Sequence, residues 1–514
     1  MKKKTKILLG CGVLLGVVVV AALVVVITVA VFLSSLEFGE MEPMRVVDTS
    51  GFAPGGSEGS GAIRVAAEWE PVLGALVAWP LMVPESLIVE IARDDTLYLL
   101  VEDEAAQGQA RDALVNLGID LESVEFVVAA AGHARPWPRD WGPPAQFGDE
   151  TGYALVDPTF DDYPLSKAAC DSKLYYQKTW FFSEFTHDDA ATRIVADTLG
   201  FSSTHIPIAL TGGNALVDGY GTVFSTCTML NENRRLGVTE DRFFSEVGRN
   251  LGISRYVVIP NFETFGIQHI DCFLKPLDEE RILVARPPEG HSHSERAEAI
   301  VQELSSLTNV HGRPYEIIRI DTQPYWRGFM PAYTNSLILN RKVLVPLFGI
   351  PADQQALETW RRAMPGYQVI GFEHDADDWE GWMWFDALHC RVRAVWDPEM
   401  LYMAHRRVDA IAAPAEAYPV EVRIRDHSGA GLILEELELK WRTRGEDGWR
   451  MSRLEPTDDA ETFAASIPGG PSGGVIEYFF SAADLSGRRE TLPRTAPDGF
   501  YSFTVSSDFE SPGP

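Results

Sequence analysis

Residues 266–273 read GIQHIDCF and place the imidazole of His269 two positions before the carboxylate of Asp271. The stretch lies at the edge of an apolar run. Because side chains alternate along a strand, we expect both groups on one side, about 7 Å apart, with Cys272 on the opposite face. This spacing suits a cation that Asp271 holds while His269 moves a proton.

The same stretch opens a repeated unit of strand, strand, helix and strand, and this repeat decides the fold. From His269 the chain reads HIDCFLKP, turns at DEE, returns as RILVAR, enters a helix near residues 294–307 and closes with YEIIRI. The other units have expected helices near residues 188–199, 240–251 and 352–364. The last unit is split, because GALVAWP, a helix from Pro84 and TLYLLV early in the chain complete the late strand CRVRAVW. Five units that close on themselves predict a ring.

The first residue of each unit takes an equivalent place at the centre of this ring. The five units open at Asp140, Asn214, His269, Asn335 and Cys390. Two glycines precede Asn214 in TGGNALVDG, which indicates a close backbone approach there and a structural role for the asparagine. The other four side chains are therefore expected to meet in one site.

These side chains suit the chemistry of a guanidinium. Prolines in WPRDWGP stiffen the backbone around Asp140. Asp140 and Asp271 repel each other unless a cation lies between them, and the planar guanidinium fork matches two carboxylates. Cys390 is then the candidate nucleophile at the central carbon. His269 is expected to protonate the departing ammonia and to activate water against the thiouronium intermediate, so that the product is a neutral ureido group.

Three further residues are candidate substrate contacts. Trp137 offers an aromatic face to an alkyl stem or a cation, although an aromatic residue more often belongs to the core. Arg139 contacts substrate or forms a salt bridge within its turn, and Asn335 is either a site contact or a strand-edge amide. His389 adjoins Cys390 but points to the opposite strand face, which predicts a core or supporting histidine.

Composition limits the classes of partner. The chain has 514 residues, 46% of them hydrophobic, with a formal net charge of -30 and a pI near 4.7. A chain of this length is expected to hold more than one domain. Its acidity disfavours nucleic acid, because neutralising phosphates needs clustered lysine and arginine. Five cysteines without a CxxC pair predict neither a disulfide framework nor a metal site, and we predict no cofactor.

The N-terminal sequence predicts export. Residues 1–6 are a basic cytoplasmic start, and residues 7–33 carry no charge and are long enough for a transmembrane helix. Lysines on the short side place the remaining chain on the periplasmic or extracellular side. Residues 34–66, with GFAPGGSEGSG at their centre, are a predicted flexible linker. The expected localisation is therefore a membrane-anchored catalytic domain outside the cytoplasm.

The C-terminal sequence has a different texture. The predicted α/β catalytic domain spans residues 67–412, and residues 413–508 contain short strand candidates separated by turns, before a tail of residues 509–514. This pattern predicts an all-β sandwich of about 100 residues. It shows no cluster of convergent polar residues, so a structural or adhesive role is its default.

The motifs resemble those of the guanidine-modifying, or pentein, superfamily, and specifically the bacterial (Porphyromonas-type) peptidylarginine deiminases grouped with the agmatine deiminases. Six stretches carry the resemblance in order and type, over roughly residues 67–409: AEWEP with a following AWP, WPRDWGP, GGNALVDG, GIQHIDCF, TNSLILN and ALHC. The resemblance implies a five-bladed αβ propeller, a thiol nucleophile and hydrolysis of an arginine-like guanidinium. It assigns guanidinium binding to Asp140 and Asp271, acid/base chemistry to His269, a site contact to Asn335 and the nucleophile to Cys390.

The resemblance leaves the substrate open. An immunoglobulin-like module after the propeller is similar to the secreted Porphyromonas-type enzyme, and with the export anchor it favours arginine in peptides or proteins, converted to citrulline. The matching stretch VDPTFDDYP lacks the arginines that grip a terminal carboxylate in that enzyme, and Asp157, Asp161 and Asp162 instead favour a positively charged substrate. Agmatine, converted to N-carbamoylputrescine, is the alternative. A catalytically silent surface-binding protein is the third hypothesis.

Overall fold

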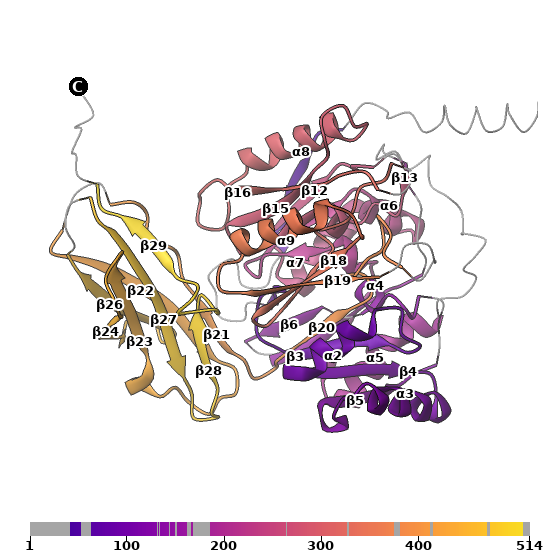
Figure 1. Cartoon of the computed structure of the whole chain (residues 1–514), viewed down its shortest axis with the longest axis horizontal. Coiled ribbons are helices and arrows are strands. Elements are labelled where there is room, and N and C mark those ends of the chain that lie inside the picture. The colour runs from indigo at the N-terminus through magenta and orange to yellow at the C-terminus, as the bar shows by residue number, and fades with distance from the viewer. Residues whose placement is uncertain are drawn as a thin grey trace, which may run out of the picture.

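The chain forms a mixed α/β body with an all-β body beside it (Figure 1). This arrangement is seen in a computed structural model, which describes residues 42–52, 63–130, 132, 134–142, 144–149, 152–161, 166–167, 186–263, 265–325, 328–374, 381–411, 415–469 and 473–506. The all-β body is the C-terminal part of the chain, drawn in orange to yellow.

The predicted membrane anchor requires a correction. Residues 7–33 lie outside the described residues, as do the predicted basic start and the C-terminal tail. Among the residues that the structure describes, no helix combines the length and the apolar character needed to cross a membrane. This finding contradicts the predicted membrane-anchored localisation, and we withdraw that prediction together with the membrane as a partner.

Four sheets of the α/β body share one pairing pattern, in which an antiparallel strand pair is extended by a parallel strand that follows a helix. Their elements, in chain order, are β6 (Ala145–Gly148), β7 (Gly152–Pro158), α5 (Thr186–Leu199) and β9 (Ser202–Ile206); β10 (Leu216–Val217), β11 (Thr222–Thr226), α7 (Glu240–Leu251) and β12 (Arg255–Ile259); β14 (Leu274–Pro276), β15 (Arg281–Arg286), α8 (Ser294–Ser306) and β16 (Glu316–Asp321); β17 (Leu337–Leu339), β18 (Lys342–Leu347), α9 (Ala352–Ala363) and β19 (Gln368–Glu373). This is the order of elements that the repeat predicts.

A fifth sheet joins the two ends of the α/β body. Strand β20 (Arg393–Trp396) pairs antiparallel with β3 (Val72–Ala78), with Arg393 opposite Leu76. Strands β4 (Thr96–Val101) and β5 (Val124–Val128) complete this sheet, and helices α2 (Glu85–Asp94) and α3 (Glu104–Asn116) connect its strands. Strands β3, β4 and β5 run parallel. The split unit thus places β20, which follows Cys390, in the same sheet as a strand more than 300 residues earlier.

Helix α7 shows how the sequence ends one element and begins the next. The Thr239 side chain accepts a hydrogen bond from the Arg242 backbone N–H, which satisfies one free donor of the first turn. Gly252 ends the helix in the left-handed conformation that glycine adopts without a steric cost. The buried face consists of Phe243, Phe244, Val247, Gly248 and Leu251. Their spacing of three and four residues lets the helix cover its sheet.

Part of the predicted linker belongs to the α/β body. Strand β1 (Arg45–Asp48) pairs antiparallel with β12, and β2 (Ile63–Val65) pairs antiparallel with β6. The prediction of a flexible tether over residues 34–66 is therefore wrong for these strands. Their apolar residues are few, and the ends of existing sheets supply the pairing that the local sequence does not signal.

The C-terminal body consists of two antiparallel sheets. Their strands are β21 (Leu401–Ala404), β22 (Ala417–Asp426), β26 (Thr462–Pro468) and β25 (Glu455–Pro456); and β24 (Arg450–Arg453), β23 (Glu438–Thr443), β27 (Val475–Ala483), β28 (Arg489–Leu492) and β29 (Tyr501–Thr504). Side chains alternate between buried and exposed along β22, as in a strand with one face on a core. Because β21 pairs with β22, this body begins before the predicted boundary at residue 413.

Polar contacts join the two bodies. Arg425 of β22 forms a 2.5 Å ion pair with Asp149, which follows β6. The Thr495 hydroxyl donates to the Pro365 carbonyl at 3.0 Å, and Arg494 donates to the Trp69 carbonyl at 3.2 Å. A cavity of about 230 Å³ lies between the bodies. The C-terminal body thus packs directly on the α/β body.

Candidate active site

The stretch GIQHIDCF does not form a strand. Strand β13 (Phe265–Gly266) ends before it, and Ile270–Cys272 forms a 3₁₀ turn, η5, that His269 precedes. Residues three apart lie on the same side of a 3₁₀ turn, so Cys272 is not directed away from His269. The predicted alternation of side chains along a strand is therefore wrong here. The site contains Cys272 as well as Cys390.

Asp140, His269 and Asp271 converge on Gly213, which lies in a second 3₁₀ turn, η4 (Gly212–Asn214). The Gly213 N–H donates to Asp140 Oδ1 at 3.2 Å, and His269 Nδ1 lies 3.5 Å from the same oxygen. A Cβ atom added to Gly213 would lie 2.7 Å from Asp140 Oδ1, 2.9 Å from His269 Nδ1 and 3.2 Å from Asp271 Oδ2. Three predicted site residues thus surround one glycine.

Gly213→Ala is expected to damage both stability and activity. The added methyl group meets oxygen and nitrogen atoms of buried, mutually bonded side chains, so the site must shift by several tenths of an ångström. Overpacking of this kind costs about 1–3 kcal/mol of unfolding free energy. Urea unfolding and ammonia release measure the two effects.

Gly108→Ala is the matched control for this exchange. Gly108 lies on the exposed side of α3, and a Cβ atom there meets nothing within 4 Å. Alanine favours helix by about 0.5–1 kcal/mol over glycine, so this variant is expected to be slightly more stable. Equal stability losses at both positions would contradict the crowding at Gly213.

Cys390 lies beside Asp271 and Asn335. Its Sγ is 3.2 Å from Asn335 Nδ2 and 3.9 Å from Asp271 Oδ2, and the residue is buried. The Asn335 Oδ1 atom accepts from the backbone N–H of His389 at 2.9 Å and of Cys390 at 3.3 Å. Asn335 therefore positions the cysteine backbone and also donates toward its sulfur.

The free protein holds Cys390 as a thiol. A hydrogen bond with Cys272 lowers the pKa of the Cys390 thiol, but burial and the negative charge of Asp271 outweigh it and raise that pKa to about 11. At neutral pH the sulfur is then protonated. A cation beside Asp271 is what would convert it to the thiolate.

Cys272 is a second free thiol at the same place. Its Sγ lies 3.5 Å from Asn335 Nδ2 and 3.6 Å from Asp271 Oδ1. Both Cys272 and Cys390 are free and buried, whereas Cys227 is disulfide-bonded. The predicted placement of Cys272 on the face opposite the site is wrong, because the 3₁₀ turn replaces the strand.

His389 supports Asp271 from behind. Its Nδ1 lies 2.7 Å from Asp271 Oδ2, and its Nε2 lies 2.5 Å from Glu68 Oε2. Burial raises the pKa of Asp271, but the hydrogen bond and charge of His389 more than offset it and hold that pKa below its usual value. Asp271 therefore remains a carboxylate. Glu68 was not predicted, although its position in the AEWEP motif was a signal.

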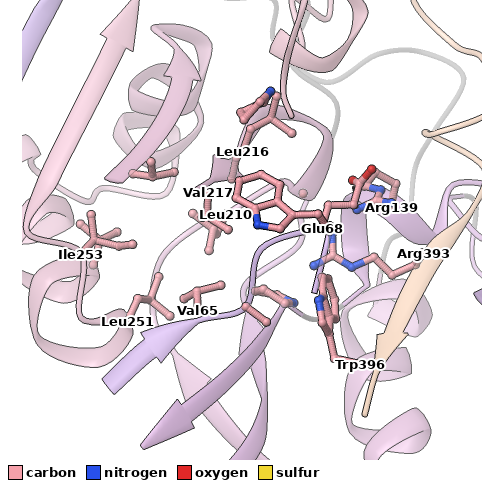
Figure 2. Close-up of a pocket in the computed structure, with 18 of the residues that line it drawn as sticks. Val65, Glu68, Arg139, Leu210, Leu216, Val217, Leu251, Ile253, Arg393 and Trp396 are labelled. Carbon is pink, nitrogen blue, oxygen red and sulfur yellow. Dashed lines mark ion pairs between the residues drawn. The ribbon is translucent and has the colours of Figure 1, made fainter. Parts of the chain in front are cut away.

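Arg139 and Glu68 line a small cavity behind this pair. Arg139 Nε donates to the His389 carbonyl at 3.2 Å, and its Nη1 lies 3.6 Å from Glu68 Oε2. Lys275 Nζ lies 2.5 Å from Glu68 Oε1. The cavity has a volume of about 50 Å³, with Glu68, Arg139 and Arg393 at one end and apolar side chains at the other (Figure 2). The Arg139 side chain is buried and engaged by the His389 carbonyl and Glu68, which favours a supporting role over the predicted substrate contact.

The charge on His269 depends on three carboxylates. Burial lowers the pKa of His269, but Asp140, Asp271 and Glu232 together raise it to about 9. Glu232 lies in α6 (Thr228–Arg235) and accepts from the Thr211 hydroxyl at 2.9 Å. Burial raises the pKa of Glu232 to about 7. No sequence signal pointed to Glu232, since nothing local distinguishes it from other helical glutamates.

His269 is expected to make stability fall as pH rises. A folded-state pKa of about 9, above the ordinary 6.5, gives a stabilisation that is complete below pH 6.5 and is lost between pH 6.5 and 9. The full effect is on the order of 3 kcal/mol. Urea unfolding at pH 6 and pH 9 should therefore show a larger loss for the wild type than for His269→Gln.

The quantity to compare is the loss of unfolding free energy between pH 6 and pH 9 in wild type and in His269→Gln. Burial lowers the pKa of Lys275 from 10.5 to about 8, so this neighbour adds stability as pH rises above 8, where its effect overlaps that of His269 with the opposite sign. The same exchange at His187, which lies exposed at the start of α5, is the control. Parallel losses in wild type and His269→Gln would contradict a cationic His269.

Three other residues singled out in the sequence lie near the site or within the core. Trp137 precedes α4 (Pro138–Trp141) and packs against the main core while staying partly exposed. Asn214 Oδ1 accepts from the backbone N–H of Thr226 and of Ile270, which matches its predicted structural role. Asp157 is buried and forms a 2.7 Å ion pair with Arg193, so it is not directed at a substrate.

Comparison with known proteins agrees with this geometry. The family model of the Porphyromonas-type peptidyl-arginine deiminases matches residues 64–381. The chain belongs to this family. It is a deiminase, a hydrolase acting on C–N bonds of linear amidines, and deiminases of this kind use a cysteine nucleophile and need no cofactor.

The individual relatives that match this chain share low sequence identity with it. A Streptomyces avermitilis protein assigned as an agmatine deiminase is 26% identical over 335 residues, covering 59% of this chain and 89% of the relative. The structure of a Porphyromonas gingivalis protein assigned as an arginine deiminase has a TM-score of 0.53 at 22% identity, covering 65% of this chain and 98% of that one. Enterococcus faecalis agmatine deiminase has a TM-score of 0.52 at 19% identity, covering 65% and 95%. The two structural likenesses establish a shared mixed α/β fold.

Proposed function

We propose that the protein hydrolyses a guanidinium group to a ureido group and ammonia, with Cys390 as the nucleophile. The observation that carries this proposal is the convergence of Asp140, His269 and Asp271 around Gly213, with Cys390 Sγ 3.9 Å from Asp271 Oδ2. Two carboxylates, an imidazole and a thiol are the groups that guanidinium hydrolysis requires.

The first half of the reaction uses Cys390 and a cationic His269. Asp140 and Asp271 hold the planar guanidinium, whose charge favours release of the Cys390 thiol proton to solvent and so the thiolate. The sulfur attacks the central carbon, the C–N bond breaks, and ammonia leaves with a proton from His269. A pKa of about 9 keeps His269 protonated at neutral pH and therefore ready to act as the acid.

The second half regenerates the thiol. His269, now neutral, takes a proton from water, and the resulting hydroxide adds to the carbon of the thiouronium. The C–S bond then breaks, the proton of the added hydroxyl passes to the sulfur, and the product leaves as a ureido compound. Trp137 and Asn335 are the proposed substrate contacts that remain after Arg139 is assigned to support His389 and Glu68.

We propose agmatine as the first substrate to test. Relatives that align with most of their own length are named agmatine deiminases, among them a protein of Medicago truncatula, which is 22% identical over 357 residues and of which 90% is covered. Two arguments favoured peptide arginine, the export anchor and the immunoglobulin-like module, and the first of them is contradicted. Peptidyl-arginine is the second candidate, since the description of the matching family supports it.

The proposed function goes with a proposed architecture of a propeller followed by a sandwich. Five sheets of similar pairing, with the first and last strands of the α/β body in one sheet, support a five-bladed propeller. Two antiparallel sheets around one core support an immunoglobulin-like sandwich at the C-terminus. We infer that the sandwich supports the catalytic domain, because it packs on it through paired polar groups.

Turnover of two substrates by the full-length protein tests the proposal. Ammonia and the ureido product are measured with agmatine and with an arginine-containing peptide blocked at both ends. We expect kcat/KM for agmatine to be about 100-fold higher, as differences in pocket contacts commonly give. The reverse order would make peptidyl-arginine the substrate. Turnover of neither would overturn guanidinium hydrolysis in favour of a silent binding protein.

A further inference from the structure

Cys272 is a buried nucleophile that the proposed reaction does not use. One amide group, Asn335 Nδ2, lies 3.5 Å from Cys272 Sγ and 3.2 Å from Cys390 Sγ. Asp271 approaches the same two sulfurs, with Oδ1 at 3.6 Å from Cys272 and Oδ2 at 3.9 Å from Cys390. Two free thiols and one carboxylate therefore face a common point.

These three groups have the separations of metal ligands. Their ligand atoms all lie within 4.8 Å of one another, and all three residues are buried. In a tetrahedral zinc site, bonds of about 2.3 Å to sulfur and about 2.1 Å to oxygen put those ligand atoms roughly 3.6 Å apart. The sulfur–oxygen separations at Asp271 are already 3.6 and 3.9 Å. An ion needs only small side-chain shifts to enter.

We propose that Asp271, Cys272 and Cys390 bind one soft divalent cation, with zinc as the expected ion. Thiolates select zinc or cadmium over magnesium or calcium, because soft ligands prefer soft cations. Binding forms two metal–sulfur bonds and one metal–oxygen bond and releases the two thiol protons to solvent. Water supplies the fourth ligand.

Neighbouring side chains are placed to support such a site. His389 Nδ1 lies 2.7 Å from Asp271 Oδ2, which fixes the carboxylate and leaves Oδ1 directed toward Cys272. The Asn335 amide donates toward both sulfurs, which stabilises their negative charge when they bind metal. Outer hydrogen bonds of this kind commonly orient metal ligands.

The ion would occupy the place of the substrate guanidinium. It takes the Cys390 sulfur and the Asp271 carboxylate, both of which the proposed deimination needs, so this consequence rests on the proposed function. Zinc is therefore expected to inhibit in competition with substrate, which raises the apparent KM while kcat is recovered at saturating substrate.

Another group of possible ligands among the described residues is Glu279, Glu280 and His311. Arginines already neutralise it, because Arg313 lies 3.0 Å and Arg407 3.7 Å from Glu280 Oε1. A cation is less favoured beside these guanidinium groups. His311→Gln is therefore a matched control that removes a possible ligand without touching the thiol site.

Direct metal binding tests the proposal independently of catalysis. The reduced full-length protein is titrated with Zn²⁺ by calorimetry and with Cd²⁺ by thiolate-to-metal charge-transfer absorbance. We expect one ion per chain, with affinity reduced by about 100-fold or more in Cys272→Ser and Cys390→Ser and unchanged in His311→Gln. Whatever activity Cys272→Ser retains should resist zinc at concentrations that inhibit the wild type.

The outcomes separate this proposal from the proposed function. Equal zinc affinity in wild type and Cys272→Ser would overturn the site, even if both proteins release ammonia. Loss of binding in His311→Gln would move the ion to the acidic group and also overturn it. Failure of every guanidine substrate would leave the charge-transfer signal as a separate result, which still decides whether the thiols bind metal.

Discussion

Replacement of Cys390 by serine is expected to lower turnover by about four orders of magnitude or more, with the fold unchanged. The hydroxyl is a far weaker nucleophile than a thiolate, and loss of a catalytic nucleophile has effects of this size. The sulfur also lies in a ready-made position, 3.2 Å from Asn335 Nδ2, which the serine oxygen would occupy with little disturbance. Ammonia release at saturating substrate measures the loss.

A second measurement ties the loss to the covalent step. Wild-type protein quenched with acid during turnover should show, by mass spectrometry, one added substrate fragment on Cys390, whereas Cys390→Ser should show none. Thermal unfolding checks that both proteins are folded. Turnover by Cys390→Ser within tenfold of the wild type would contradict Cys390 as the nucleophile.

The repeat predicted the order of elements in the α/β body and the proximity of several candidate side chains. The units opening at Asp140, His269, Asn335 and Cys390 could be aligned because each strand begins after a polar residue and carries a short apolar run. Sheet pairing then places these residues together, as Asn335 bonding the backbone of Cys390 across 55 positions shows. Periodicity therefore predicted long-range neighbours without any knowledge of distances.

The local conformation at His269 did not follow from the same reasoning. Alternation predicts which face a side chain takes only while the backbone is extended, and the turn at Ile270–Cys272 breaks it. Gln268, at a φ of 58°, adopts a left-handed conformation that a strand pattern does not anticipate. The misplacement of Cys272 and the missed contact of His389 with Asp271 both come from assuming a strand.

The buried charged side chains behind the site could not be predicted from the sequence pattern either. Glu68 and Glu232 lie far from His269 along the chain, and neither has a spacing that marks it. Two signals were available: Glu68 lies in the AEWEP motif, and a lysine inside the apolar run HIDCFLKP, Lys275, is either exposed or paired. The structure shows that it is paired, with Nζ 2.5 Å from Glu68 Oε1.

Asp271→Asn is expected to lower turnover and to raise the rate at which Cys390 is alkylated. The amide cannot hold a guanidinium by charge, so kcat/KM should fall by about three orders of magnitude. The negative charge of Asp271 also raises the pKa of the Cys390 thiol. Its removal should lower that pKa, so that iodoacetamide modifies Cys390 faster at neutral pH even though turnover is lost.

Asp218→Asn is the matched control, since Asp218 is also buried but accepts its hydrogen bonds from the backbone of Tyr220 and Thr222 in the turn before β11. This variant should lose stability while the pH dependence of Cys390 alkylation stays unchanged. A defect in folding alone would lower turnover without speeding alkylation. Slower alkylation in Asp271→Asn would show that the carboxylate does not keep the Cys390 thiol protonated. It would also contradict the proposal that a bound cation is needed to form the thiolate.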